Sequence, residues 1–407
     1  MMKIKYFRAP LLLGVLLIHS LLLGAIIASP AAQAQDTAAP AVLAPVPAPP
    51  VLGAKSYILQ DFASGRILVE KNADLRVDPA SITKLMTSYV VFNELAQGKL
   101  KLDDITTVSE KAWRTEGSRM FIEVNKQVRI EDLIKGMVIQ SGNDASVALA
   151  EHIAGTEESF ASMMNQYAAQ LGLNDSHFVN ATGLPDPDHF VTARDVATLS
   201  AAIIRQFPTY YAWYSEKEFT FNKIRQHNRN TLLWRDPAVD GLKTGHTEAA
   251  GYCLVASAKQ KGMRLISAVM GAESQRARVA DVQALLNYGF RFFETHQLYQ
   301  AGQSLTETQV WKGKVDKVSL GIKDELFVTI RRGRYDDLDA RVTINPQLSA
   351  PINIGQTLGQ LQIYLDQKEI VSSPLIAMTE VPEAGFFGRS YDGISLWFAG
   401  LFGDDDE

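Results

Sequence analysis

Cysteine is nearly absent from this chain of 407 residues, because Cys253 is the only one. A single thiol excludes an internal disulfide, and in a secreted chain we expect it to be buried as a small apolar side chain. No spacing of His, Cys, Asp or Glu is typical of a metal site, so neither a metal nor another cofactor is expected. Basic residues are also too few for a nucleic-acid-binding protein, since the formal net charge is −5 at pH 7.

The N-terminus has the pattern of an export signal. A positive region, an apolar run and a small-x-small cleavage pattern follow one another at Lys3, Lys5 and Arg8, at residues 11–27, and at Ala32-Gln-Ala34. The alternative is an uncleaved anchor, because the apolar run has about the minimum length of a spanning helix. We predict a signal peptide over residues 1–34, whose removal changes the formal net charge from −5 to −8. Residues 35–54, rich in Ala and Pro, then form a linker.

The first motif that suggests chemistry is Ser81-Ile-Thr-Lys84. Pro79 suits a helix start, and apolar residues recur at helical spacing after Ser81, which places Lys84 on the same face as Ser81. A serine hydroxyl needs a neighbouring base to become a nucleophile, and a desolvated lysine can act as that base. The free N–H groups of the helix start suit a developing oxyanion. Taken alone, such a pattern is more often a helix cap beside a solvated lysine.

The second motif, Ser141-Gly-Asn143, interrupts two helical patterns at residues 130–139 and 145–153. Gly142 is free to take a strained backbone conformation. A loop held between two helices can aim a hydroxyl and an amide into a cleft. Taken alone, two helix caps are the commoner explanation of this pattern.

The third motif, Lys243-Thr-Gly245, precedes two strand-like runs at residues 252–258 and 263–270, which residues 259–262 join as a hairpin. A lysine here can attract the free carboxylate of a substrate, and Thr244 can donate a hydrogen bond to it. Gly245 allows another backbone to approach closely. The alternative is a lysine that protects a sheet edge.

The order of the three motifs is more informative than any one of them. They are separated by 60 and 102 residues and follow the order of serine acyl-enzymes that attack the D-Ala-D-Ala end of peptidoglycan stems or its β-lactam mimics. A class A β-lactamase would carry Ser-Asp-Asn in the middle motif and a deacylating glutamate, whereas this chain has Ser-Gly-Asn and no Glu-x-x-Leu-Asn segment. A non-catalytic penicillin-binding sensor and a cell-wall binder with a dead site are further alternatives. No transmembrane helix follows the domain, however, and every catalytic side chain is present.

Beyond the motifs, the chain resembles low-molecular-mass penicillin-binding proteins of the D-alanyl-D-alanine carboxypeptidase type, related to penicillin-binding protein 5. The resemblance covers the chain after residue 52, and its clearest stretches are residues 57–65, 228–234, 243–247, 251–258 and 285–294. It implies an α+β fold with a β-lactamase/transpeptidase-like catalytic domain at residues 55–297. A small C-terminal all-β sandwich domain at 298–382 and an amphipathic helix with an acidic tail at 383–407 complete the expected architecture.

The resemblance implies catalytic roles for three residues. Ser81 is acylated by the penultimate D-Ala of a peptidoglycan stem pentapeptide, Lys84 takes the Ser81 proton, and Ser141 relays a proton to the leaving amine. β-Lactams would acylate the same serine as inhibitors. From the residues themselves, burial and the nearby charge of Lys243 should lower the pKa of Lys84.

The resemblance also implies a set of substrate-binding residues. Asn143 holds the substrate amide, Lys243 and Thr244 face the terminal carboxylate beside Gly245, and the backbone N–H of His246 completes an oxyanion hole with that of Ser81. Arg278 is expected near the same carboxylate.

After residue 298 the helical periods fade and short β-rich runs replace them. We predict strands at residues 309–311, 317–320, 326–330, 340–344 and 361–365, with turn residues between them. No candidate catalytic group lies in these runs, so the resemblance implies a role in spacing or partner binding. No protein partner can be named from the sequence.

The C-terminus carries a one-sided aromatic pattern. On a helical wheel, eight large apolar residues fall within about 160° of arc: Phe386, Phe387, Tyr391, Ile394, Trp397, Phe398, Leu401 and Phe402. The pattern predicts a helix that lies in a membrane interface, with packing on the protein as the alternative. With the export signal, it predicts a periplasmic enzyme attached to the outer face of the inner membrane. The acidic residues 404–407 would be repelled by anionic lipids.

Overall fold

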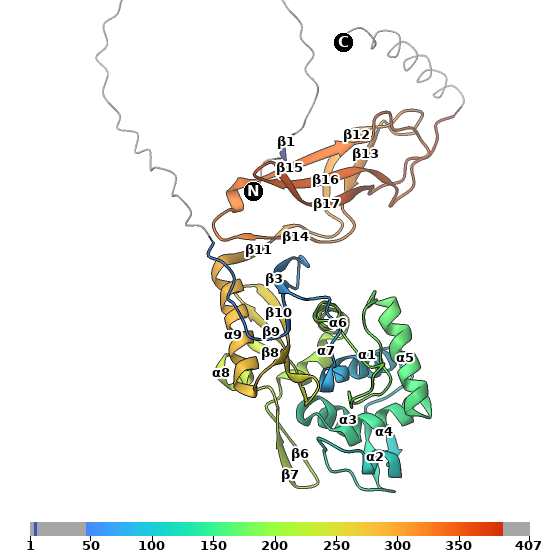
Figure 1. Cartoon of the computed structure of the whole chain (residues 1–407). Coiled ribbons are helices and arrows are strands. Elements are labelled where there is room, and N and C mark those ends of the chain that lie inside the picture. The colour runs from blue at the N-terminus through green and yellow to red at the C-terminus, as the bar shows by residue number, and fades with distance from the viewer. Residues whose placement is uncertain (1–3, 6–45, 386–407) are drawn as a thin grey trace, which may run out of the picture. The chain divides into compact units, whose positions relative to one another are not determined.

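The computed structural model describes residues 4–5 and 46–385 (Figure 1). The chain divides into two compact units. The larger unit consists of residues 48–296 and 327–332, and the smaller unit includes residues 297–326 and 333–385. Most of the predicted signal peptide and linker, and the predicted amphipathic helix from Phe386 onward, lie outside the described residues.

A five-stranded antiparallel sheet forms the centre of the larger unit, in the order β3-β2-β10-β9-β8. The strands are β2 (Ser56–Asp61), β3 (Ile67–Lys71), β8 (Val239–Thr247), β9 (Gly251–Gln260) and β10 (Met263–Ala272). The predicted hairpin is confirmed, because β9 and β10 pair directly. Its turn residues Lys261 and Gly262 both have positive φ, 51° and 83°, as a two-residue turn that matches the strand twist requires.

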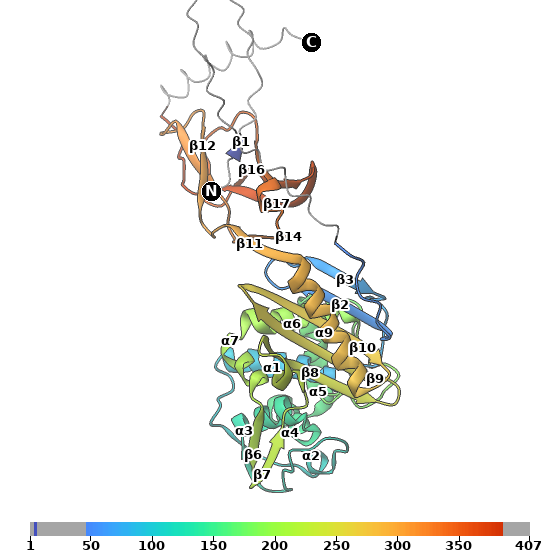
Figure 2. The same ribbon diagram turned by 90° about the vertical axis from the view of Figure 1, so that its left-hand side faces the viewer.

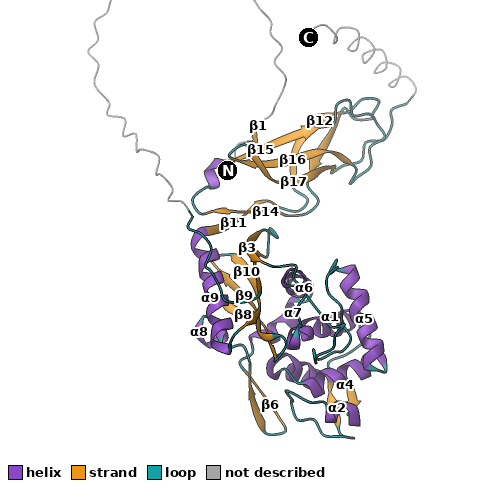
Figure 3. Ribbon diagram, viewed as in Figure 1, coloured by secondary structure: helices purple, strands orange, loops and turns teal. Residues whose placement is uncertain are grey.

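Helix α9 (Gln275–Phe292) packs against β9 and β10, while most of the other helices gather on the opposite side of the sheet (Figures 1, 2 and 3). These are α1 (Lys84–Ala96), α2 (Glu110–Arg114), α3 (Ile130–Lys135), α4 (Asn143–Ala154), α5 (Glu157–Gln170), α6 (Ala193–Gln206) and α7 (Pro208–Tyr211). The short helix α8 (Leu232–Arg235) contacts β8 and is drawn on the α9 side of the sheet in Figures 1 and 3. Two small hairpins accompany them, β4 (Ile105–Thr107) with β5 (Gln127–Arg129), and β6 (Glu218–Phe221) with β7 (Ile224–His227).

Several helices begin where the sequence supplies a capping hydroxyl. Ser109, Thr156, Thr192 and Ser274 each accept a hydrogen bond from the backbone N–H three residues later. Each such cap satisfies one of the N–H groups that a helix start leaves without an intrahelical acceptor, and contributes about 1 kcal/mol.

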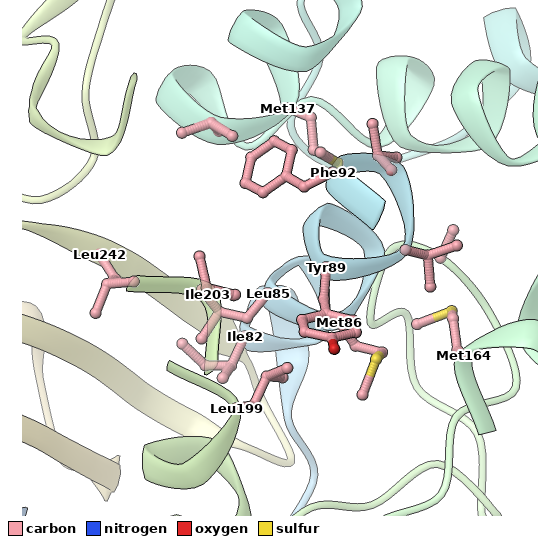
Figure 4. Close-up of a cluster of buried hydrophobic side chains, with 14 of the residues drawn as sticks. Ile82, Leu85, Met86, Tyr89, Phe92, Met137, Met164, Leu199, Ile203 and Leu242 are labelled. Atoms are coloured by element: carbon pink, nitrogen blue, oxygen red, sulfur yellow. The ribbon is translucent and has the colours of Figure 1, made fainter. Parts of the chain in front are cut away.

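Helix α1 lies at the centre of the core and is buried on all sides, as a helix with apolar residues around its whole circumference should be. Figure 4 shows its side chains pointing to several other elements. They meet Met137, Met164 on α5, Leu199 and Ile203 on α6, and Leu242 on β8. Each fully buried side chain of this size contributes about 1.5–3 kcal/mol. The segment immediately before α1, which contains Ser81, is therefore attached to the most firmly packed element of the unit.

The all-β character predicted for the smaller unit is confirmed. Its sheet has the order β1-β15-β16-β17-β13-β12, antiparallel except where β1 joins β15. The strands are β1 (Ile4–Lys5), β12 (Ser304–Gln309), β13 (Lys317–Gly321), β15 (Leu338–Ile344), β16 (Thr357–Leu365) and β17 (Lys368–Ala377). The strand predicted at residues 309–311 is wrong, because β12 ends at Gln309 and Trp311 forms only an isolated bridge with Ser349.

Strands β11 (Phe293–Tyr299) and β14 (Leu326–Arg331) form a separate two-stranded sheet. After residues 297–326, which belong to the smaller unit, the chain returns to the larger unit at residues 327–332. The sequence pattern did not indicate this return. None of the helices within residues 46–385 is both long enough and apolar enough to cross a bilayer.

Candidate active site

Ser81 lies in a strained turn directly before α1. It is the second residue of the 3₁₀ turn Ala80–Thr83, and Ala80 adopts a left-handed φ of 47° although it carries a side chain. Gly183 makes this turn possible, because a Cβ there would lie 1.7 Å from the carbonyl oxygen of Ala80. Gly245 on β8 is needed for a similar reason, since its Cβ would lie 3.0 Å from the carbonyl oxygen of Pro79. Two glycines thus let a loop and a strand close around the turn.

Lys84 is fully buried, and its ammonium nitrogen meets three acceptors. Nζ donates to Ser81 Oγ at 3.0 Å, to Asn143 Oδ1 at 2.6 Å and to the backbone oxygen of Thr182 at 2.6 Å. An ammonium has three N–H donors, so every donor has a partner. If the group loses a proton, one of the three contacts must reverse, and only the hydroxyl of Ser81 can then donate to the amine.

Burial lowers the pKa of Lys84 to about 7, because removal of water disfavours the charged form. The carboxylates of Asp144 and Glu157 act in the opposite direction and raise it. We had expected the charge of Lys243 to contribute beside burial, but the charges that act most on Lys84 are these two acids. At neutral pH a substantial fraction of Lys84 is therefore uncharged.

Asn143 orients the lysine rather than standing free in the cleft. Its Oδ1 accepts from Lys84, while its Nδ2 donates to the backbone oxygen of Glu116 at 2.6 Å and its backbone N–H donates to that of Ser118 at 2.7 Å. The neighbouring Asp144 is buried and holds the same loop, because its carboxylate accepts from the backbone N–H groups of residues 120, 121 and 122 at 2.9 to 3.3 Å.

Ser141 carries the strain of the second motif. Its φ is 68° and ψ 33°, at the end of the π-helical turn Gly136–Gln140, whereas Gly142 has an ordinary φ of −59°. The strained conformation that Gly142 is free to take is found instead at Ser141. Residue 142 must be glycine because a Cβ would lie 2.8 Å from Asp144 Oδ1. The hydroxyl of Ser141 is buried and has no hydrogen-bond partner among the described residues, so its bonding capacity is available to a bound molecule.

Lys243 and Thr244 lie in β8 opposite β9. Lys243 is buried, and within the described part of the chain its Nζ donates only to the backbone oxygen of Thr244, at 3.1 Å. Its pKa is well below that of an ordinary lysine, mainly through burial and further through the charges of Lys84, Arg229 and Arg278. Lys243 therefore lies near two arginines, and both Lys243 and Arg278 have donors without a partner among the described residues, an arrangement that favours an anionic ligand.

Arg278 on α9 reaches across the sheet. Its Nη1 donates to the backbone oxygens of Gly245 at 3.0 Å and of Cys253 at 3.3 Å. Its Nε is buried without a partner among residues 46–385, and burial lowers its pKa. Arg278 therefore fixes the strand that carries the third motif while one donor stays unused.

A cleft of about 360 Å³ brings the three motifs together. It is lined by Ser81, Ser118, Ser141, Arg229, Thr244, Gly245, His246, Tyr252, Gln275 and Arg278. Two of these, His246 and Tyr252, pair their rings at 3.9 Å. No acidic side chain is among these lining residues. Lys84, Asn143 and Lys243 are buried, and Lys84 and Lys243 bond to the lining residues Ser81 and Thr244.

Sequence reasoning missed several contributors to this cleft. Thr182 acts through a backbone carbonyl, which no side-chain pattern reveals. Asn180 holds that carbonyl in place, because its Oδ1 accepts from the N–H groups of Thr182 and Gly183 at 3.1 and 2.7 Å. Arg229 is exposed and follows the β6–β7 hairpin. Its place within residues 228–234, one of the stretches that carry the family resemblance, is the signal that could have identified it.

No group of His, Cys, Asp and Glu side chains within residues 46–385 is arranged to hold a metal ion. The thiol of Cys253 is buried on β9, where burial raises its pKa to about 11, so it stays protonated and unreactive at neutral pH. The chemistry available in the cleft is that of a serine beside a partly neutral lysine, facing an anion-binding subsite.

Comparisons with known proteins agree on one family. Residues 44–274 match the family model of D-alanyl-D-alanine carboxypeptidases, and residues 293–383 match that of the penicillin-binding protein 5 C-terminal domain. The chain is 46% identical to the D-alanyl-D-alanine carboxypeptidase DacA of Escherichia coli K12 over 366 residues, covering 88% of this chain and 91% of the relative. It is 48% identical to DacC of the same strain over 362 residues, covering 87% and 90%.

Solved structures show the same likeness. The structure of penicillin-binding protein 5 from Haemophilus influenzae superposes with a TM-score of 0.81 at 45% identity, and the match covers 83% of this chain and 99% of that one. Penicillin-binding protein 6B from Escherichia coli gives a TM-score of 0.69 at 37% identity, covering 81% and 97%.

The electrostatic setting of Lys84 can be tested directly. Asp144→Asn removes a carboxylate that raises the pKa of Lys84, so the pKa should fall below its present value of about 7. Glu157→Gln should act in the same direction. NMR titration of ¹³C-labelled lysine side chains measures the shift, with Asp175→Asn on the surface as the control. An unchanged or higher pKa in both buried-site variants would contradict the charge assignment.

Proposed function

Because the chain belongs to the D-alanyl-D-alanine carboxypeptidase family, we propose that it removes the terminal D-Ala from peptidoglycan stem pentapeptides through an acyl-enzyme on Ser81. The observation that carries this assignment is the 3.0 Å contact between Ser81 Oγ and the buried Nζ of Lys84. A serine acyl-enzyme and penicillin binding are general in this family. The proposal therefore concerns which residues of this chain perform each step.

Lys84 is the base in this proposal. In its neutral form the amine keeps two N–H donors, which bond to Asn143 Oδ1 and to the backbone oxygen of Thr182, while its lone pair faces Ser81 Oγ. A pKa of about 7 supports this role, because a base with a pKa near the working pH is both available and strong enough to take a proton. The two fixed acceptors aim the lone pair at the nucleophile.

Acylation then proceeds with a balanced proton transfer. Ser81 Oγ attacks the carbonyl carbon of the penultimate D-Ala, and its proton moves to Lys84 Nζ. The backbone N–H groups of Ser81 and His246 stabilise the oxyanion. The first backbone hydrogen bond of the turn that contains Ser81 is donated by the N–H of Ile82 to the Pro79 oxygen, so the N–H of Ser81 is not used in that bond. The C–N bond breaks, the hydroxyl of Ser141 passes a proton to the departing amine of D-Ala, and the Lys84 ammonium returns its extra proton to Ser141. Water later hydrolyses the ester and frees Ser81.

The terminal carboxylate of the substrate is bound by the cationic side of the cleft. Burial lowers the pKa of Lys243 and of Arg278, the charges of Arg229 and Arg278 lower that of Lys243 further, and the charge of Arg229 acts in the same direction on Arg278. Thr244 lines the same cleft. A carboxylate relieves the repulsion between these cations and accepts their unused donors. This subsite explains why the enzyme would act at a free C-terminus rather than within a chain.

We further propose that the enzyme works in the periplasm, attached to the inner membrane through residues 386–402. The support is the one-sided aromatic pattern of that segment and the export signal at the N-terminus. The two proposals are independent, because no residue of the cleft lies beyond Arg278.

The nucleophile is tested by Ser81→Ala. The variant should lose D-Ala release from a synthetic pentapeptide and should lose covalent labelling by a fluorescent penicillin, because the ester forms on the Oγ that the substitution removes. Ser162→Ala, on the surface of α5, is the matched control and should keep both activities. Release by Ser81→Ala at the parent rate would remove Ser81 from the mechanism.

The base is tested by pH and by Lys84→Arg. Protonated Lys84 has no lone pair, so the acylation rate of the parent should rise with pH through a midpoint near 7, the pKa of this group. A guanidinium stays protonated at any working pH, so Lys84→Arg should acylate about 10²–10⁴ times more slowly. Stopped-flow acylation by a chromogenic penicillin measures both, with Lys111→Arg as the control. A variant that acylates at the parent rate would exclude Lys84 as the base.

Membrane attachment is tested by two deletions. Removal of residues 386–407 should release the protein from membranes while activity on small peptides is unchanged. Removal of the acidic residues 404–407 alone should leave the protein bound. Because the acidic tail is repelled by anionic lipids, high salt should not release the intact chain. Sedimentation with membranes is the measurement, and release of the intact chain by salt would contradict an apolar attachment.

A further inference from the structure

Two exposed apolar side chains gather at one end of the smaller unit. Among the described residues of this unit, Val315 and Ile354 are its exposed large hydrophobic residues, with 49% and 69% of their surface accessible. Val315 lies in the loop between β12 and β13, and Ile354 lies in the loop between β15 and β16. Strands β13, β14 and β15 lie between these two loops in the sequence, so the presence of an exposed apolar side chain on both of them needs an explanation.

Both loops flank the segment through which the chain leaves the unit. The backbone N–H of Lys314 donates to the oxygen of Pro382 at 2.9 Å, and that of Ala384 donates to the oxygen of Lys312 at 2.8 Å. On the other side, residues 352 and 381 exchange two backbone hydrogen bonds of 3.0 and 2.9 Å. We call residues 310–316, 349–354 and 381–385 together the exit end of the unit; Figure 1 shows the chain leaving there.

The exit end is firmly built, so the exposure of its apolar side chains is not that of a loose loop. Ile352 and Val381 are buried in the hydrophobic core of the unit. Gly313 packs so closely that a Cβ there would lie 2.7 Å from both the Val315 oxygen and a methyl group of Val381. Ile354 follows the buried Ile352 by two residues and is exposed.

The next residues of the chain indicate what lies against this end. Phe386 and Phe387, the first members of the aromatic segment that we propose to bind the membrane, follow Gly385 directly. A segment held in a bilayer interface keeps the residues covalently joined to it within a few ångströms of that surface. The exit end would then face the same lipids that hold residues 386–402.

Charge and area favour a lipid partner over a protein. The charged side chains of this end and its margins balance, with Lys312, Lys314 and Lys317 against Asp316, Glu380 and Glu383. Such a surface is not selective for an acidic or basic partner. A stable protein interface buries about 1,200 Å² or more, far beyond two side chains, whereas each apolar side chain that enters a bilayer interface adds to binding separately.

We propose that the exit end docks on the bilayer, with Val315 and Ile354 inserted into the lipid interface beside the C-terminal segment. This inference rests on the proposed membrane attachment and adds a second contact to it. Two loops of the unit would then fix the orientation of that unit on the membrane, which a single attachment through the C-terminal segment does not require.

The test uses the full chain with single environment-sensitive labels. Val315→Cys and Ile354→Cys are each labelled with a nitrobenzoxadiazole probe, since the native Cys253 is buried and should not react. Val51→Cys and Ile105→Cys, at residues of the larger unit that are 97% and 55% exposed, are the matched controls. On addition of phosphatidylcholine vesicles, the emission at positions 315 and 354 should shift to shorter wavelength, and the controls should not change.

A charge variant gives a second reading. Val315→Asp with Ile354→Asp should lower the vesicle partition coefficient of the full chain by about tenfold, because two apolar insertions are lost. Val51→Asp with Ile105→Asp should leave it unchanged. Circular dichroism reports that each variant is folded, and D-Ala release from a small peptide should be unchanged, since none of these residues belongs to the cleft.

Each other outcome overturns the proposal in a distinguishable way. If the parent chain binds vesicles but the probes at 315 and 354 do not shift, the docking inference is wrong and the membrane attachment stands. If the parent chain does not bind vesicles, both fail. If the probes at 315 and 354 already emit at shorter wavelength than the controls before vesicles are added, and deletion of residues 386–407 removes this difference, the C-terminal segment covers this end. A shift that depends on protein concentration would instead indicate a second copy of the chain.

Discussion

The burial of Lys84 is the constraint on which the site depends. A lysine removed from water needs a hydrogen-bond acceptor for each donor, and the fold supplies Asn143 Oδ1 and the Thr182 oxygen beside Ser81. Each acceptor must itself be held. Asn143 is fixed by the loop that the buried Asp144 carboxylate organises, and Thr182 is fixed by the side chain of Asn180. The loops that carry Asn143 and Thr182 are distant in sequence, and both place an acceptor at the amine of Lys84.

The site also contains backbone strain that the core must offset. Ala80 and Ser141 both occupy left-handed conformations although they carry side chains, at a cost of about 1–3 kcal/mol each. Helix α1 supplies the compensation, because Leu85, Met86 and Phe92 are fully buried immediately after the strained turn. Each contributes about 1.5–3 kcal/mol. A short strained turn joined to a buried helix places a hydroxyl rigidly at the wall of the cleft.

The sequence predicts the parts of this architecture that side chains specify locally. The motifs locate Ser81 and Lys84 because their spacing is a property of one helical turn, and the β9–β10 hairpin follows from its turn residues. The pairing of β2 with β10 joins segments about two hundred residues apart, and no local pattern reveals it. Thr182 contributes only a carbonyl, which every residue has. The left-handed conformation falls on Ser141, and Gly142 is required because the Asp144 carboxylate occupies the space beside it; neither tertiary feature can be read from the motif. Strand β17 was missed because its burial alternates weakly.

Two buried lysines take opposite tasks in one cleft because their surroundings differ. Lys84 faces fixed neutral acceptors, and burial leaves it able to give up its proton near pH 7. Lys243 has unused donors, and its pKa is lowered by burial and by three neighbouring cations. A substrate carboxylate placed among those cations reverses the balance at Lys243, since an adjacent anion favours the ammonium. In the proposed mechanism, binding of the correct terminus restores the charge of Lys243, while Lys84, whose pKa burial lowers to about 7, acts as the base. The proposed mechanism thus divides recognition and proton transfer between two lysines whose burial and charged neighbours differ.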